Sequence, residues 1–251
     1  MKTAKQERLN RFLARAGVAS RRGSDKLIQT GRIQVNGELV EAPGVLIDPD
    51  SDLVHFDSQQ IQVPEESTYL LLNKPSGFLV SAGDPHHTKT VFDLLEGITV
   101  RLFPVGRLDL DTTGVLLLTD DGDLSYRLTH PRYGIRKVYR ATVRGIPSDD
   151  ALAMLREGVD IDEGRTAPAE ARLVKSEGRY GLLELVLREG RKRQVKQMCA
   201  AVGHRVHTLD RTEFAGIGKG GLNRGGWRHL RTEEVVQLQN LVGLSPRGVS
   251  R

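Results

Sequence analysis

The sequence predicts an α+β protein, with a small N-terminal ααβ unit joined to a larger domain that has a mixed, mostly antiparallel sheet. Residues 1–60 contain two amphipathic helix patterns followed by a hairpin signal. Ser58 to Thr68 then has the polar composition of a linker. Beyond it, short apolar runs of strand length outnumber helix patterns. We therefore place the first domain at 1–60, a linker at 61–68, the second domain at 69–244 and a disordered tail at 245–251.

The composition is that of a globular protein with a slightly basic balance. Hydrophobic residues make up 38% of the 251 positions and charged residues 27%, while the net charge of +5 hints at a polyanionic partner. The single cysteine, Cys199, excludes an internal disulfide and a zinc site with several cysteines. No apolar run approaches the ~18 residues of a membrane span, and Met1 to Asn10 lacks the apolar core of a secretory signal. We expect a cytoplasmic protein with no membrane partner.

The first unit is predicted to contain two helices and a hairpin. Apolar residues from Leu9 to Ala16 recur at helical spacing, which predicts a helix over Glu7–Ala16. Ser20 is the expected N-cap of a second helix, which ends near Gly31. The dipeptide Asn36-Gly37 between alternating residues is a strong hairpin signal, and a further strand is expected over Leu53–Phe56.

Basic residues gather around the second helix of this unit. They could bind phosphate oxygens or could be a solvated face, and we favour RNA contact by four of them: Arg21, Arg22, Lys26 and Arg32. The run from Leu9 to Gly37, with a leucine-rich helix, Ser-Arg-Arg, a second helix and Val-Asn-Gly, resembles an S4 domain. That resemblance implies binding to structured RNA, mainly through shape and phosphates.

The larger domain shows four strand-like runs and three helix patterns. The strands are predicted at 69–73, 114–119, 139–143 and 182–187. The helices are predicted at 150–157, 194–202 and 233–241. These patterns favour a large sheet that carries helices, which is the α+β arrangement.

The segment Gly106 to Gly114 places two carboxylates, Asp109 and Asp111, directly before a predicted buried strand. Loops held by a rigid sheet often carry catalytic groups, although Asp and Thr also satisfy the backbone of ordinary turns. The Asp-x-Asp-x-Thr pattern is also similar to the phosphoryl-transfer motif of haloacid-dehalogenase-like enzymes. We set that alternative aside because the motif normally opens its domain, whereas forty residues of domain precede it here, with Arg107 two positions ahead of Asp109.

Two later segments complete the candidate site. Tyr139 enters a predicted strand, where a tyrosine usually packs with its hydroxyl at the surface. In Glu189 to Met198, Val195 and Met198 lie on the inward face of a helix. Four cations gather at the start of that helix, against its dipole: Arg191, Lys192, Arg193 and Lys196. We therefore expect an RNA phosphate or a buried carboxylate to lie near these four cations and to stabilise their charges.

Taken in this order behind the S4-like unit, the three segments resemble ribosomal RNA pseudouridine synthases of the RsuA/RluB type. Gly225-Gly226-Trp227, with Leu222 and Arg224, resembles the C-terminal segment of the large-subunit synthase B branch. The resemblance spans about Leu9 to Leu241. It implies that Asp109, and not Asp111, is the catalytic aspartate and that Tyr139 is the active-site tyrosine. It places the family's pair of an aliphatic and a basic residue on Val195 and Lys196, with Lys196 contacting Asp109.

The resemblance also implies the reaction and its partners. The protein would isomerise a uridine of ribosomal RNA without cofactor or metal, with Asp109 acting either as nucleophile or as base. Arg107 would hold the phosphate of the flipped nucleotide or fill its gap, and Arg191, Lys192 and Arg193 would contact RNA. The large-subunit branch implies a 23S RNA uridine near the peptidyl-transferase region, and a 16S or tRNA uridine is the alternative. A non-catalytic RNA-binding or assembly factor is the other alternative, and we expect a monomer.

Other patterns carry no prediction of a site. The pairs His86-His87 and His204/His207 lack neighbouring cysteine or acidic ligands at the spacing a metal needs. The run Gly218 to Gly221 resembles a phosphate-binding loop but lacks the hydroxyl residue after its lysine. We expect Cys199 to be an inert core residue.

Overall fold

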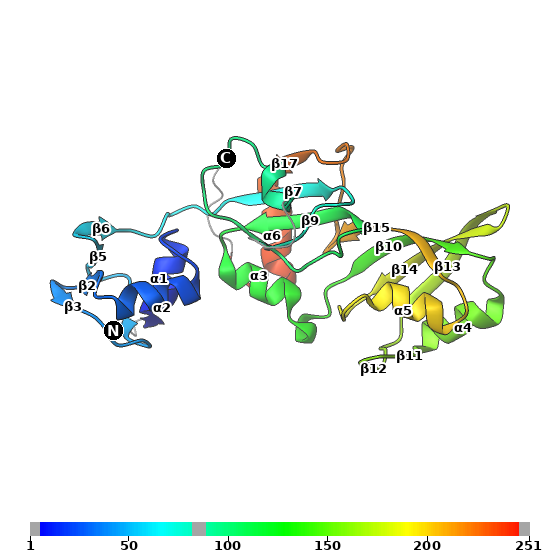
Figure 1. The fold of residues 1–251 in the computed structure, drawn as a ribbon, viewed down its shortest axis with the longest axis horizontal. Helices are drawn as coiled ribbons and strands as arrows, with labels where there is room; N and C mark the ends of the chain where they lie inside the picture. The colour runs from blue at the N-terminus through cyan, green and yellow to red at the C-terminus, as the bar shows by residue number, and fades with distance from the viewer. Residues whose placement is uncertain (1–5, 82–88, 246–251) are drawn as a thin grey trace. The chain divides into compact units, whose positions relative to one another are not determined.

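The computed structural model describes residues 6–81 and 89–245, which form two compact units, Met1–Ser67 and Thr68–Arg251. Figure 1 traces the chain through both units. The pair His86-His87 and the predicted tail, apart from its first residue, lie outside the described residues. Each unit has its own hydrophobic core.

The first unit packs two helices against a small sheet. The helices are α1 (Leu9–Arg15) and α2 (Arg21–Gln29). The sheet has the order β3-β2-β5-β6, formed by β2 (Ile33–Val35), β3 (Glu38–Leu39), β5 (Val54–Phe56) and β6 (Gln59–Ile61). A separate antiparallel pair joins β1 (Glu7–Arg8) and β4 (Leu46–Ile47).

Local signals explain most of this unit. The Ser20 side chain accepts a hydrogen bond from the Gly23 amide at 3.0 Å and so caps α2. Asn36 and Gly37 both have positive φ, 54° and 86°, as a two-residue hairpin turn requires. Two details differ from the sequence prediction. The chain is extended at Glu7 and begins its helix at Leu9, and β6 occupies part of the stretch that has linker composition.

The second unit is built on one long sheet. Its strand order is β13-β14-β10-β15-β9-β7-β17, and every neighbouring pair is antiparallel except β15 with β9. The strands are β7 (Tyr69–Lys74), β9 (Thr113–Thr119), β10 (Lys137–Arg144), β13 (Glu170–Glu177), β14 (Tyr180–Leu187), β15 (Val206–Phe214) and β17 (Trp227–His229). Shorter strands are β8 (Phe103–Pro104), β11 (Asp160–Ile161), β12 (Gly164–Arg165) and β16 (Ile217–Gly218).

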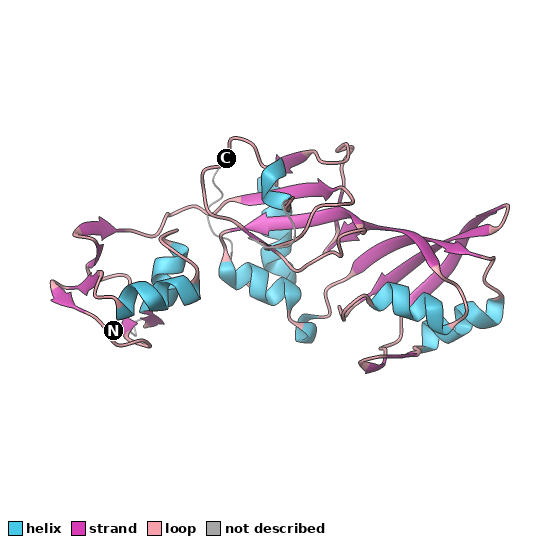
Figure 2. Ribbon diagram, viewed as in Figure 1, coloured by secondary structure: helices cyan, strands magenta, loops and turns pink. Residues whose placement is uncertain are grey.

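The helices cover the two ends of this sheet separately, as Figure 2 shows. Residues of α4 (Asp149–Glu157) and α5 (Gln194–Ala201) form one core with β10 and β14. Residues of α3 (Gly122–Thr129) and α6 (Thr232–Leu241) form another with β7 and β9. The opposite face of β7 and β9 packs on the short helix η1 (Val91–Leu94), and a second short helix, η2 (Pro131–Tyr133), follows α3. The sheet therefore has two halves with separate cores.

The two halves meet at the parallel contact between β9 and β15. Only Thr113 with Asp210 and Gly114 with Arg211 are in register there. Gly114 has φ +111°, and a side chain at this position would overlap the backbone of Arg211. The Arg211 side chain, almost fully buried, donates to the carbonyl of Val115 at 2.8 Å. The close approach at Gly114 thus holds the halves together.

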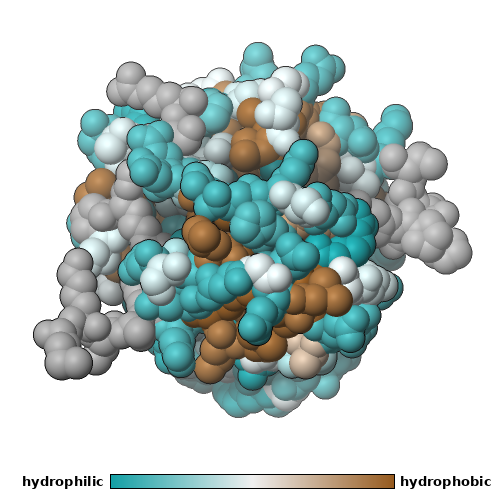
Figure 3. All heavy atoms as spheres, turned by 90° about the vertical axis from the view of Figure 1, so that its left-hand side faces the viewer, coloured by the Kyte–Doolittle hydropathy of each residue, from teal (hydrophilic) through white to brown (hydrophobic). Residues whose placement is uncertain are grey.

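The surface is mostly polar. The face in Figure 3 shows hydrophilic residues around smaller hydrophobic areas. Three leucines of the first unit, Leu39, Leu46 and Leu53, are about half exposed. Within the part of the chain that the structure describes, no helix is long and apolar enough to span a membrane.

Candidate active site

The segment that carries Asp109 and Asp111 is a turn wrapped around a buried lysine. Lys74, the last residue of β7, is completely buried. Its Nζ donates to four backbone carbonyls, those of Thr112 at 2.9 Å, Pro75 at 3.0 Å, Asp109 at 3.1 Å and Leu110 at 3.2 Å. The amide of Thr112 closes the turn by donating to the Asp109 carbonyl at 3.1 Å. Lys74 therefore fixes the backbone on which both carboxylates stand.

Burial also changes the acid–base behaviour of this lysine. Removing the ammonium from water lowers the pKa of Lys74 to about 8, while the nearby carboxylates of Asp111 and Asp109 act in the opposite direction. The sequence did not point to Lys74. The available signal was a lysine two residues after the apolar run Tyr69 to Leu72, because that position is buried if the strand continues.

Lys196 lies between the two carboxylates. Its Nζ is 3.2 Å from Oδ2 of Asp109 and 2.5 Å from Oδ1 of Asp111. The lysine side chain is 14% exposed, whereas that of Asp111 is 68% exposed. The hydrogen bond from Lys196 lowers the pKa of Asp111. The structure thus shows the expected contact with Asp109, together with a shorter contact to Asp111 that the sequence did not suggest.

A small cavity of about 70 Å³ brings the predicted residues together. Arg107, Asp109, Tyr139 and Val195 all line it. Tyr139 comes from β10 and Val195 from α5, so the cavity lies where the half of the sheet that carries α5 meets the loop before β9. Val195 is buried and Leu187 adds to the wall, which leaves the Asp109 carboxylate against a partly apolar surface.

The cations at the start of α5 divide into two kinds. Arg191 is bound within the protein, to Glu189 at 3.2 Å and to the carbonyls of Glu163 and Gly164 at 3.0 and 3.1 Å. Lys192 and Arg193 are exposed and make no side-chain hydrogen bond or ion pair to another described residue. Arg191 therefore holds the loop between β11 and β12, a role that the sequence analysis did not separate from RNA contact.

Glu189 is a second residue whose position the sequence did not predict. Its carboxylate accepts hydrogen bonds from Gln194 at 2.6 Å, from the amide of Ala167 at 3.1 Å and from Arg191. Gln194 in turn accepts from the amide of Arg191 at 3.0 Å. This network orders the turn into α5 and hence the position of Lys196.

The basic residues of the first unit also differ in whether another side chain of the protein binds them. Arg21, Arg22 and Lys26 are exposed on α2, with no side-chain partner among the described residues. Arg32 instead forms a bidentate pair with Asp57 and lies over the Phe56 ring, 4.6 Å from its centroid. Three of the four predicted phosphate contacts are therefore available, and the fourth is occupied by a carboxylate.

His204 contacts the backbone, and Cys199 is buried in the core. The Nδ1 of His204 is 3.0 Å from the carbonyl of Arg144. No group of three potential metal ligands gathers among the described residues. Burial raises the pKa of the Cys199 thiol to about 12, so it remains protonated at neutral pH.

Comparisons with known proteins agree with this arrangement. A family model described as RNA pseudouridylate synthase matches residues 68–201, and a model of the S4 domain matches residues 7–53. The chain therefore belongs to the RNA pseudouridylate synthase family. It is an S4-domain pseudouridine synthase of the RsuA/RluB type, an isomerase.

Three similar proteins illustrate the match. The ribosomal large subunit pseudouridine synthase B of Bacillus subtilis (strain 168) is 42% identical over 237 residues, 94% of this chain and 96% of that protein. The ribosomal small subunit pseudouridine synthase A of Yersinia pestis is 35% identical over 234 residues, 92% of this chain and 97% of that protein. A crystal structure of a pseudouridylate synthase has a TM-score of 0.67 at 32% identity and covers 92% of this chain and 99% of its own.

Proposed function

We propose that this pseudouridine synthase acts on ribosomal RNA and that Asp109 is its reacting carboxylate. The observation that carries the assignment is the position of Asp109. It lines a small cavity with Tyr139 and Val195, and its carboxylate lies 3.2 Å from the ammonium of Lys196. Asp111, by contrast, lines a larger neighbouring cavity and not this one.

The chemistry needs little beyond one ionised carboxylate. The reaction breaks the bond between N1 of uracil and C1′, turns the detached base and forms a bond between C5 and C1′. The proton on C5 leaves to solvent and N1 takes up a proton, so the product has the same composition as the substrate and no co-reactant is consumed. Asp109 would either attack C1′ or remove the 2′ proton. In both cases the Lys196 ammonium, 3.2 Å away, lies beside the carboxylate that takes part in the step.

The other residues of the small cavity fit a flipped base. A nucleotide must leave its stack to reach Asp109, and an aromatic ring such as that of Tyr139 would support the extruded uracil. Val195 would pack beside the base and exclude water. Arg107, exposed at the rim, would bind the phosphate of the flipped nucleotide or fill its gap.

We infer that the substrate is 23S ribosomal RNA, near the peptidyl-transferase region. The higher identity to a protein named as a large-subunit synthase, 42% against 35% for the small-subunit relative, supports this choice. The S4 domain supports a structured RNA target. A 16S or tRNA uridine and a purely RNA-binding role are the alternatives that the test below separates.

The test is tritium release from unmodified transcripts that carry uridine labelled with tritium at C5. We expect release from the 23S transcript at one site, which sequencing of the product then locates. Release from 16S or tRNA transcripts alone would replace the proposed substrate. RNA binding without release from any transcript would contradict the catalytic assignment and favour an assembly factor.

A further inference from the structure

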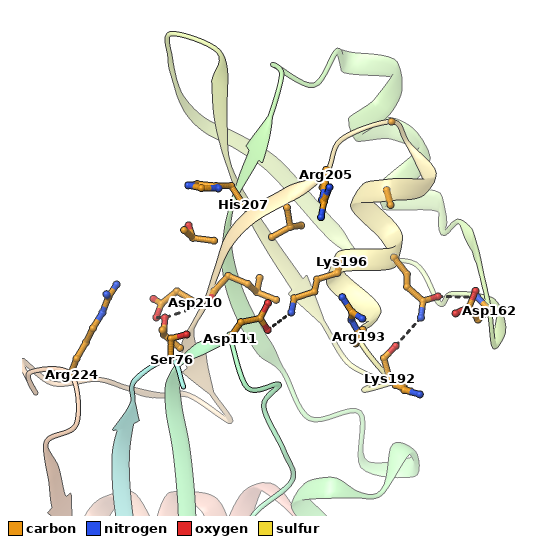
Figure 4. Close-up of a pocket in the computed structure, with 17 residues that line it drawn as sticks. Ser76, Asp111, Asp162, Lys192, Arg193, Lys196, Arg205, His207, Asp210 and Arg224 are labelled. Atoms are coloured by element: carbon orange, nitrogen blue, oxygen red, sulfur yellow. Dashed lines mark hydrogen bonds and ion pairs between the residues drawn. The ribbon is translucent and has the colours of Figure 1, made fainter. Parts of the chain in front are cut away.

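A second, larger cavity of about 950 Å³ adjoins the small one that contains Asp109. The two share the side chains of Arg193 and Leu209. Figure 4 shows this cavity between α5, the start of β15 and the loops that carry Ser76 and Arg224. Its size is at the upper end of the ~300–1,000 Å³ typical of ligand sites. It therefore offers room for more than the flipped base.

The charges around this cavity favour an anion. Two of the three carboxylates on its wall are paired within the protein. Asp111 is paired with Lys196 and Asp210 with Lys219, both at 2.5 Å. The third belongs to the exposed Asp162, whose backbone amide donates to the side-chain oxygen of Gln197 at 2.9 Å.

The cations, in contrast, are available. Four of them make no side-chain hydrogen bond or ion pair to any other described residue: Lys192, Arg193, Arg205 and Arg224. These four are all exposed. Lys192 and Arg193 directly precede α5, Arg205 precedes β15, and Arg224 lies in the loop before β17. The charge of Arg193 also acts on Asp111. Exposed cations along a hollow are the usual footprint of a phosphate backbone.

An aromatic pair lies on the same wall. His207, the second residue of β15, lines the cavity and is exposed. Its ring rests against Tyr180 of β14, with centroids 5.3 Å apart and planes at 33°. Because one face of the imidazole packs on the tyrosine, its position is fixed while the histidine remains exposed at the cavity. Free cations beside a supported aromatic ring are the features with which proteins bind single-stranded nucleic acid.

We propose that this cavity holds a single-stranded segment of the substrate RNA next to the target uridine, with phosphates on Arg193, Arg205 and Arg224 and one base stacked on His207. This inference rests on the proposed function, which supplies the RNA. It adds the residues that receive the neighbouring nucleotides and makes His207 the platform on which one of their bases stacks.

The test measures binding of the full chain to a short fluorescein-labelled oligouridylate by anisotropy over a range of salt concentrations. Arg205→Ala and Arg224→Ala should each weaken binding and reduce the log–log salt slope by about 0.7, the value for one phosphate contact on a single strand. His207→Ala should weaken binding by roughly 5- to 150-fold at an unchanged slope, which is the range that loss of one stacked base gives. His207→Tyr should restore it.

Matched controls separate these effects from general loss of charge or fold. Arg101 is exposed and lines neither cavity, so Arg101→Ala should change neither affinity nor slope. His204→Ala removes a histidine whose ring contacts the Arg144 carbonyl instead of lining the cavity, and it should bind as the unmodified chain does. The same oligonucleotide in a duplex should be insensitive to His207→Ala, because its bases are already stacked.

A photo-crosslink supplies the location. An oligouridylate containing 4-thiouridine should crosslink to the tryptic peptide 206–211, which contains His207. Absence of that crosslink, or variants that bind as the unmodified chain does, would overturn the inference even if tritium release from ribosomal RNA is normal. If binding and crosslinking follow the expected pattern while no transcript releases tritium, the cavity is a single-strand binding site and the proposed catalytic function fails.

Discussion

The ammonium of Lys74 donates to the backbone carbonyl oxygen of Asp109 at 3.1 Å. A completely buried lysine therefore contacts the backbone of the proposed reacting residue. Three further carbonyls of the same region share this ammonium. A lysine has three N–H donors only while it is protonated. The geometry of the turn therefore depends on the protonation of a group whose pKa is about 8.

Removing Lys74 should lower the rate and change the pH dependence of stability. We expect Lys74→Met to reduce single-turnover rates by at least about tenfold, because four carbonyls lose their donor and the turn relaxes. The pKa of Lys74 is lower in the folded state than the 10.5 of a free lysine, so the folded protein binds fewer protons between about pH 8 and pH 10.5. The unmodified protein should gain stability relative to Lys74→Met as the pH rises through that window, by up to about 1.4 kcal/mol per pH unit. Urea unfolding of both proteins at several pH values would measure this, and a constant difference would contradict it.

The two carboxylates of the turn should differ sharply in their effect on turnover. Asp109→Asn should abolish activity, by more than about a thousandfold, as loss of a reacting group does in other enzymes. RNA binding should survive, because its affinity comes from other side chains. Asp111→Asn should cost less than about tenfold, since Lys196 would then pair with Asp109 alone and Asp111 is largely exposed. Equal losses in tritium release would show that the wrong carboxylate has been chosen.

Lys196 should influence the single-turnover rate. Lys196→Met removes the ammonium that lies 3.2 Å from Asp109 and 2.5 Å from Asp111, so the two carboxylates lose the contact that holds them. The maximum single-turnover rate should then fall. Lys196→Arg should retain most activity, because it keeps the charge near both carboxylates. If Lys196→Met weakens RNA binding and leaves the rate at saturating enzyme unchanged, its role is phosphate contact.

Gly114 should tolerate no side chain. Gly114→Ala places a methyl group against the backbone of Arg211 at a φ of +111° that alanine avoids, and we expect a loss of at least about 3 kcal/mol in unfolding free energy. Gly178, in the turn between β13 and β14, has φ +54° with open space around it, so Gly178→Ala should cost only about 1 kcal/mol. Thermal and urea unfolding of the two variants compares them directly.

The first unit should contribute phosphate contacts through α2 but not through Arg32. Replacing Arg21, Arg22 and Lys26 together by alanine should weaken binding to ribosomal RNA and lower the log–log salt slope by about 2.1–2.7, at 0.7–0.9 per contact. Arg32→Ala should leave the slope nearly unchanged, because its guanidinium is already neutralised by Asp57. A slope that falls only with Arg32→Ala would reverse the assignment.

Much of the fold was predictable because it depends on local signals. Ser20 as a cap, Asn36-Gly37 as a turn and the apolar runs that become β7, β9, β10 and β14 all appear in the structure. The helix α3 was missed although Asp121 caps it and Leu124 and Leu128 have helical spacing, because the acidic cluster before it resembled a loop. The central strand β15 was missed because its polar residues, such as Arg211, are buried by long-range partners.

The residues of the candidate site that belong to sequence motifs were predictable. Asp109, Tyr139 and Val195 line one cavity, and Lys196 contacts Asp109, as the resemblance implied. The functions of individual cations were not predictable, since a charge run does not reveal partners distant in sequence. Arg191 and Arg32 are bound within the protein, whereas Lys192 and Arg193 make no side-chain hydrogen bond or ion pair to a described residue. The role of Lys74 was not predictable from the sequence either, because its acceptors are backbone carbonyls.

The junction between β9 and β15 has a consequence for how the enzyme is made. The turn that carries Asp111 and the lysine that pairs with it are 85 residues apart in the chain and belong to opposite halves of the sheet. During synthesis, the turn that carries both carboxylates emerges before α5 exists. A ribosome-bound nascent chain that ends before residue 194 thus lacks Lys196 and cannot hold its aspartate in the paired state. Both carboxylates of the turn therefore lack their ammonium partner until translation has passed residue 196.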